Sequence, residues 1–232
     1  MTEIAEEQDI TSGLDGIKFE YDSTLRINNI EYSLKNGNFD DDDIHKLLND
    51  FKYRSKKFDM FKIMTNILPR PARDKKRVRN LIGQRKWKEL RQNLYEDSEH
   101  KCDICDKNIG NDRFYLGDSW RYNFDERKIV LQGLYITCGL CNIGRNVGAG
   151  FVVDDEKKKD VEEHFLKVNQ CNIDEYNEYK KYVADLNVFI LTTNIDWQMD
   201  YGIYNDIIKQ KIIDIDNKKK SKKPMSIFRK KR

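Results

Sequence analysis

Two cysteine pairs, Cys102 with Cys105 and Cys138 with Cys141, constrain the fold of this chain more than any other feature. Each pair has the C-x2-C spacing that lets both thiolates reach one tetrahedral metal ion. The 32 residues between the pairs suit a β-hairpin that returns the chain to the metal. Four thiolates leave no coordination position open, so we expect a structural zinc site. A redox site would need only one pair, and Cys171 stands alone.

Composition and hydropathy favour a soluble, intracellular protein. No apolar run approaches the roughly 18 residues that a membrane span requires, so we expect no membrane partner. The acidic N-terminus lacks the pattern of a secretory signal peptide. Five cysteines in 232 residues then favour a reducing compartment over a disulfide framework, and we expect a protein that is not secreted.

A net charge of +3 conceals strong segregation of charge. Residues 1–51 hold 13 acidic and 4 basic side chains, whereas residues 52–91 hold 15 basic and 3 acidic ones. Residues 217–232 hold nine Lys or Arg and no acid. Two separate basic segments favour a polyanionic partner, although a lysine-rich tail is also common as a solubilising feature. The acidic N-terminus and the basic tail are also candidate docking segments for protein partners.

Hydrophobic periodicity predicts an α+β chain in five segments. These are an acidic disordered segment at 1–16, a hairpin and helix at 17–67, a zinc module at 68–152, a helical segment at 153–215 and a basic tail at 216–232. Before the cysteines we expect a hairpin within 17–35, with alternating runs at 17–21 and 25–27, then a helix begun by Asp40 to Asp43 and a helix through Trp87, Leu90 and Leu94. Between the cysteine pairs we expect strands from Phe114 and from Lys128, joined by a turn at 123–127. After them we expect helices through Val161, Phe165 and Val168 and through Tyr176 to Ile190, and a short helix at 203–212.

The flanks of the cysteines carry a resemblance to a known family. In order along the chain stand the stretches Leu68-Pro69-Arg70-Pro71, Arg77 to Ile82, Trp87-Lys88-Glu89-Leu90-Arg91, the first cysteine pair, Trp120 to Asp125, Val130 to Leu134 and the second pair. From about Leu68 to Tyr201 the sequence resembles bacterial and phage HNH endonucleases with a four-cysteine zinc site. The resemblance implies a zinc-stapled ββα core of the treble-clef type flanked by helices, and a helical C-terminal segment that includes residues 196–201.

The resemblance also implies where a catalytic site would stand. In this family a histidine at the end of the first strand is the general base, and His, Asp or Asn residues hold a second, catalytic metal ion. Here Gly117 falls at the position of the base and Asp118 at the acidic position after it. Asn142 and Asn146 fall at the two helical positions where relatives have histidines.

These departures predict a degraded catalytic site. The three histidines, His45, His100 and His164, lie outside the expected positions, and we interpret each as an ordinary, partly exposed side chain. Losing a general base costs about 10² to 10⁴ in rate. The alternative is an active nuclease in which Asp118, Asn142 and Asn146 hold Mg²⁺ or Mn²⁺ and another residue, such as Asp125, is the base.

Nucleic-acid binding would survive the loss of catalysis. We expect phosphate contacts, to DNA before RNA, from basic residues near the cysteines: Arg73, Lys75, Lys76, Arg77, Arg79, Arg85, Lys86 and Arg145. Three hypotheses therefore stand. They are an impaired HNH-like zinc protein that binds nucleic acid, an active metal-dependent HNH endonuclease with altered ligands, and a protein–protein adaptor on the same scaffold.

Overall fold

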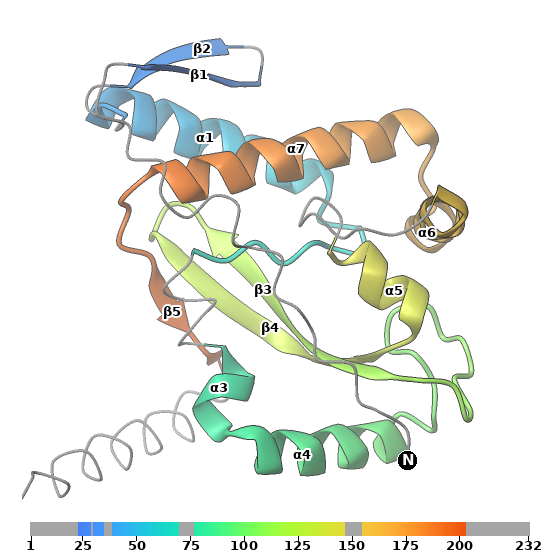
Figure 1. The fold of residues 1–232 in the computed structure, drawn as a ribbon. Helices are drawn as coiled ribbons and strands as arrows, with labels where there is room; N and C mark the ends of the chain where they lie inside the picture. The colour runs from blue at the N-terminus through green and yellow to red at the C-terminus, as the bar shows by residue number, and fades with distance from the viewer. Residues whose placement is uncertain (1–22, 29, 35–38, 70–76, 147–154, 203–232) are drawn as a thin grey trace, which may run out of the picture.

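The structure is a computed structural model that describes residues 23–28, 30–34, 39–69, 77–146 and 155–202 (Figure 1). It has the α+β architecture expected from the sequence. The elements in chain order are β1 (Ser23–Ile27), β2 (Ile30–Leu34), α1 (Asp41–Lys57), α3 (Val78–Ile82), α4 (Gln84–Asp97), β3 (Tyr115–Asn123), β4 (Lys128–Thr137), α5 (Gly139–Gly144), α6 (Asp155–Asn169), α7 (Ile173–Thr192) and β5 (Gln198–Asp200). No helix among them combines the length and apolarity that crossing a membrane requires.

The β3–β4 hairpin lies at the centre of the molecule (Figure 1). Its strands pair antiparallel from Tyr115↔Thr137 to Asn123↔Lys128, which confirms the predicted strands and turn. Because successive side chains of a strand point to opposite faces, Asp118 and Trp120 are buried on one face. Gly117, Ser119 and Arg121 belong to the other face. The chain leaves β4 directly into α5, so a ββα unit surrounds the second cysteine pair.

The third strand of this sheet corrects one expectation. Residues 196–201 are not helical, because Gln198–Asp200 forms β5, which pairs in parallel with β4. The physical reason is burial of two aromatic side chains that flank the strand. Trp197 packs edge-on against Tyr122 with ring centroids 4.7 Å apart, and Tyr201 packs against Trp120 at 5.6 Å. The short helix expected at 203–212 lies outside the described residues.

Helices α1 and α7 lie side by side above the hairpin (Figure 1). Asp40 caps α1 by accepting a hydrogen bond from the backbone N–H of Asp43 at 2.8 Å, as the acidic start predicted. Asn172 and Glu175 form a capping box at the start of α7. Buried aromatic rings join the two helices, with the centroids of Phe51 and Phe189 at 5.1 Å.

The N-terminal hairpin is present with a different first strand. Strands β1 and β2 pair antiparallel from Ser23↔Leu34 to Ile27↔Ile30, within the predicted 17–35 range. The predicted run at 25–27 belongs to β1, whereas the run at 17–21 lies outside the described residues, as do the acidic segment 1–16 and the tail 216–232.

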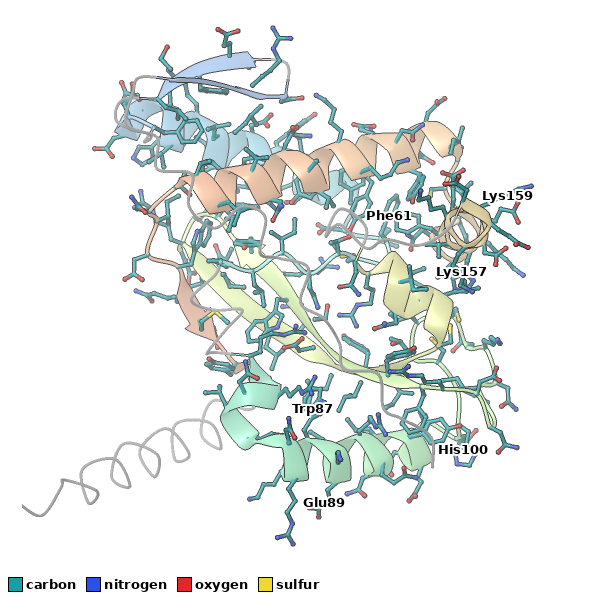
Figure 2. The ribbon with its side chains drawn as sticks, viewed as in Figure 1. Phe61, Trp87, Glu89, His100, Lys157 and Lys159 are labelled. Carbon is teal, nitrogen blue, oxygen red and sulfur yellow. The ribbon has the colours of Figure 1, made fainter. Side chains whose placement is uncertain are left out.

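Helix α4 precedes the first cysteine pair and confirms the helix predicted through Trp87, Leu90 and Leu94. Gly83, with a φ of +82°, separates α3 from α4, a conformation that glycine adopts without strain. On α4 the Trp87 side chain points toward the sheet and Glu89 points away from it (Figure 2). At the end of α4 the buried Tyr95 stacks on Phe114 with ring centroids 3.8 Å apart.

Candidate functional site

The four cysteines of the two pairs come together as predicted. Their sulfur atoms all lie within 4.8 Å of one another, and three of the four residues are buried. The Sγ atoms of Cys105 and Cys138 are 3.8 Å apart. Zn–S bonds of about 2.3 Å in a tetrahedron place sulfurs about 3.8 Å apart, so this spacing fits a zinc ion. The cluster can hold a metal ion, and its all-thiolate composition favours zinc.

Backbone hydrogen bonds shape the first knuckle around the metal position. The N–H of Cys102 donates to the carbonyl of Lys107, and the N–H of Asp106 donates to the carbonyl of Cys102, both at 2.9 Å. Asp103 joins this knuckle to the end of β4. Its N–H donates to the carbonyl of Ile136 at 2.9 Å, and its carboxylate accepts the N–H of Ile136 at 2.5 Å. The two cysteine pairs are thus held together by the protein as well as by the metal that they can share.

The ionisation of the four thiols is coupled. Hydrogen bonds from Cys138 and Cys141 lower the pKa of the Cys102 thiol, whereas burial raises the pKa of Cys105 to about 11. Hydrogen bonds with Cys102 and Cys138 raise the pKa of Cys141. Ionisation of Cys102 is therefore favoured, whereas Cys105 and Cys141 resist it. A bound divalent metal would supply the charge that stabilises all four thiolates, and its binding would release protons.

Sequence reasoning missed a role for His164. Its Nε2 atom lies 3.1 Å from the Sγ of Cys141, so the ring donates to the sulfur when Nε2 carries the proton. Burial lowers the pKa of His164, which favours the neutral ring. No sequence signal could have found this contact, because His164 belongs to α6 and only the packing of α6 on α5 brings it to the cluster. His45 and His100 are exposed, as interpreted from the sequence.

Arg145 occupies the space next to Gly117 on β3. A Cβ atom added at Gly117 would lie 2.7 Å from Nη1 of Arg145, closer than real contacts allow. Arg145 ends α5 and is 6% exposed, so it does not contribute to an open basic surface. Its Nη2 donates to the backbone carbonyl of Asp118 at 2.7 Å. The guanidinium thus lies where the resemblance places a general base.

We expect Gly117→Ala to lower the free energy of unfolding by about 1–3 kcal/mol, the usual cost of overpacking a filled site. Arg145 is buried and bonded to Asp118, so it cannot move aside freely. Gly139→Ala is the matched control, because nothing lies within 4 Å of a Cβ atom there. Urea denaturation of both variants checks the expectation, and equal stabilities would contradict it.

Asp118 is held by an arginine and not left free for a metal. The residue is 1% exposed, and both of its carboxylate oxygens accept hydrogen bonds from the Arg77 guanidinium, one of them at 3.2 Å from Nε. Burial disfavours the charged form, but Arg77 outweighs it and holds the pKa of Asp118 below its usual value. Asn66 completes the arrangement, since its amide donates to the carbonyl of Asp118 and accepts the N–H of Trp120 at 3.2 Å.

A hydrogen bond joins the two asparagines at the end of α5. The Asn146 side chain donates to the carbonyl of Asn142 at 2.7 Å, which caps the end of α5. Asp125, the alternative base, lies in the β3–β4 turn and pairs with Lys52 of α1 at 2.6 Å. Asp125 is therefore engaged elsewhere, and no cluster of His, Cys, Asp or Glu side chains that includes Asp118 is present among the described residues.

The predicted basic residues fall into three groups. Arg73, Lys75 and Lys76 lie outside the described residues. Arg77, which is half-buried, and Arg145, which is buried, both contact Asp118. The exposed members are Arg79 on α3 and Arg85 and Lys86 on α4, with Lys88 and Arg91 beside them. We call Arg79, Arg85, Lys86, Lys88 and Arg91 the α4 basic face.

Comparison with known proteins returned no family model, no curated protein and no solved structure that matches this chain. The thiol cluster, the buried contacts around Asp118 and the α4 basic face are thus the features from which function is inferred.

Proposed function

We propose that the chain is an HNH-nuclease-like zinc protein that binds nucleic acid and has lost the catalytic metal site. The observation that carries the proposal is the pair of arginines around the hairpin. Arg145 fills the space beside Gly117, and Arg77 binds both carboxylate oxygens of Asp118. A catalytic Mg²⁺ would need free oxygen ligands and room for its waters. Here Arg77 occupies the carboxylate oxygens of Asp118, and Arg145 occupies the space beside Gly117.

The zinc ion in this proposal is structural. Cys102, Cys105, Cys138 and Cys141 would hold it, and four thiolates leave no position for water or substrate. Its contribution is to fix the first knuckle against the start of α5. The hairpin between the pairs then has a defined position relative to α4 and α6.

Binding is supported by the α4 basic face. Its five cations are exposed, and none of them forms an ion pair within the described residues. Such cations contact phosphates without reading sequence, so affinity should be salt-dependent and weakly specific.

We expect the charge reversals Lys86→Glu and Lys88→Glu, made together, to weaken binding of a DNA duplex about tenfold or more at low salt. The slope of log affinity against log salt should fall by about 1.8, since each phosphate contact contributes about 0.9. Lys158→Glu with Lys159→Glu on α6 is the control with the same change of charge. Figure 2 shows Lys159 on this helix. An electrophoretic titration across salt concentrations measures both quantities.

The same assay with Mg²⁺ or Mn²⁺ tests the catalytic part. We expect binding of plasmid DNA without nicking at either metal. Nicking by the wild-type protein would contradict the lost metal site and favour the active endonuclease. Absence of any binding at low salt would contradict the nucleic-acid function and favour the protein–protein adaptor.

A further inference from the structure

Two adjoining pockets lie on the face of the hairpin that carries Gly117, Ser119 and Arg121. The knuckle pocket, about 400 Å³, is bounded by the first cysteine knuckle, residues 61–64 and Arg145. The turn pocket, about 320 Å³, is bounded by the end of α1 and the β3–β4 turn. Arg121 and Gln132 line both pockets, so the two adjoin in one recess of the surface, which we call the paired pockets.

The paired pockets collect cations from segments far apart in sequence. These cations are Lys52, Lys56, Lys62, Arg121 and Arg145. The lining acids are Asp103, Asp106 and Asp125, which leaves an excess of two positive charges (five minus three).

Internal contacts account for only some of these cations. Lys52 pairs with Asp125 at 2.6 Å, and Arg121 pairs with Asp59 at 2.9 Å. Lys56 and Lys62 are exposed, and among the described residues neither they nor Arg145 has an ion-pair partner. The recess therefore presents uncompensated positive charge.

Arg145 is the buried cation of this set, and it has no carboxylate partner among the described residues. Its guanidinium carries five N–H donors, and the carbonyl of Asp118 accepts from one nitrogen. A buried cation without a carboxylate partner is costly, and an anion entering the pocket would offset that cost. Ser119 and Tyr135 line the same pocket and add hydroxyl donors. A planar guanidinium with flanking hydroxyls and lysines suits a phosphate.

We propose that the paired pockets bind successive phosphates of one nucleic-acid strand, with Arg145 at the inner position. This assignment rests on the proposed nucleic-acid-binding function and adds a second surface to it. Pockets of about 400 and 320 Å³ are too small to admit a duplex, whereas a single strand can place one phosphate in each. The α4 basic face lies on the other side of the hairpin from α1 (Figure 1), so the two surfaces can be tested separately.

The test is the pair of charge reversals Lys56→Glu and Lys62→Glu, made together in the full chain. Both side chains are exposed and unpaired among the described residues, so folding should be retained. We expect affinity for a labelled 20-nucleotide single-stranded DNA to fall about tenfold or more, with a salt slope smaller by about 1.4, since each contact to a single strand contributes about 0.7. An equal loss of affinity for a single-stranded RNA of the same length would show that the site binds the phosphates of both DNA and RNA.

Two comparisons decide the outcome. Lys158→Glu with Lys159→Glu should leave single-strand affinity unchanged, whereas the α4 double variant should affect duplex more than single-strand binding. The paired-pocket assignment alone is overturned by one pair of results. In it, the Lys56→Glu and Lys62→Glu protein binds single strands as the wild type does, and the Lys86→Glu and Lys88→Glu protein has lost duplex binding. A wild-type protein that binds neither strand nor duplex overturns the proposed function and this assignment together.

Discussion

Cys102→Ser should abolish metal binding and destabilise the hairpin module. A serine hydroxyl does not ionise at neutral pH, so the cluster would keep three thiolate ligands and lose its closed shell. Apparent binding free energies of about 10–16 kcal/mol for structural zinc in zinc-finger peptides suggest a loss of several kcal/mol here. Cys102 is fully buried, which removes any compensation by solvent. Metal content by mass spectrometry and thermal unfolding measure the two effects.

Cys171→Ser is the matched control for this experiment. Cys171 is a half-buried thiol outside the cluster, at the start of the α6–α7 connection. Its replacement should leave one zinc per chain and change the melting temperature little. Adding a chelator should lower the melting temperature of the wild type and of Cys171→Ser alike, but not that of Cys102→Ser. Full zinc content in Cys102→Ser would contradict the four-thiolate site.

Arg77→Met should destabilise the protein by about 1–3 kcal/mol at neutral pH, less than the about 3–5 kcal/mol for breaking a fully buried ion pair, because the Arg77 side chain is 41% exposed and solvent screens the pair. Asp118 is 1% exposed, so its carboxylate would be left charged and buried, or would have to take up a proton. Arg79→Met is the matched control on the adjacent helix α3. Arg79 is exposed, and its replacement should change the free energy of unfolding by less than about 0.5 kcal/mol.

The pH dependence distinguishes an ion pair from simple packing. The pKa of Asp118 is lowered in the folded protein, so the contribution of this group to stability is present above its unfolded pKa of about 3.9. That contribution is lost as the pH falls through the lowered folded pKa. Burial without Arg77 would raise the pKa of Asp118 instead. The difference in stability between wild type and Arg77→Met should therefore shrink in acid, and a constant difference would contradict the ion pair.

Local patterns were enough to predict the elements and the thiol cluster. The C-x2-C spacing fixes each half of the cluster within four residues, and alternation between the pairs predicts the hairpin that joins them. Asp40 and the stripes on α6 and α7 likewise carry their information within a few turns of helix. Residues 196–201 were predicted wrongly because the packing of Trp197 and Tyr201 on the hairpin decides their conformation.

The surroundings of Asp118 could not be read from the sequence. Arg77 and Arg79 stand in one basic run, yet one binds a buried carboxylate and the other faces solvent. The charge composition of the sequence does not distinguish these two arginines. Arg145 follows a cysteine knuckle in the sequence, and only the packing of α5 on β3 buries it. Contacts between segments decide these cases, and a single sequence does not record them.

The close approach of Arg145 to Gly117 links two distant positions in the gene. A side chain at residue 117 and an arginine at residue 145 compete for the same volume. A histidine introduced at residue 117 would meet the Arg145 guanidinium already in place, so it would not fit there unless Arg145 moved. A side chain at residue 117 would therefore be accommodated more readily together with a smaller residue at position 145. The effects of the two replacements should therefore not be additive, and a Gly117→Ala variant that also carries a smaller residue at position 145 should avoid the steric conflict of Gly117→Ala alone.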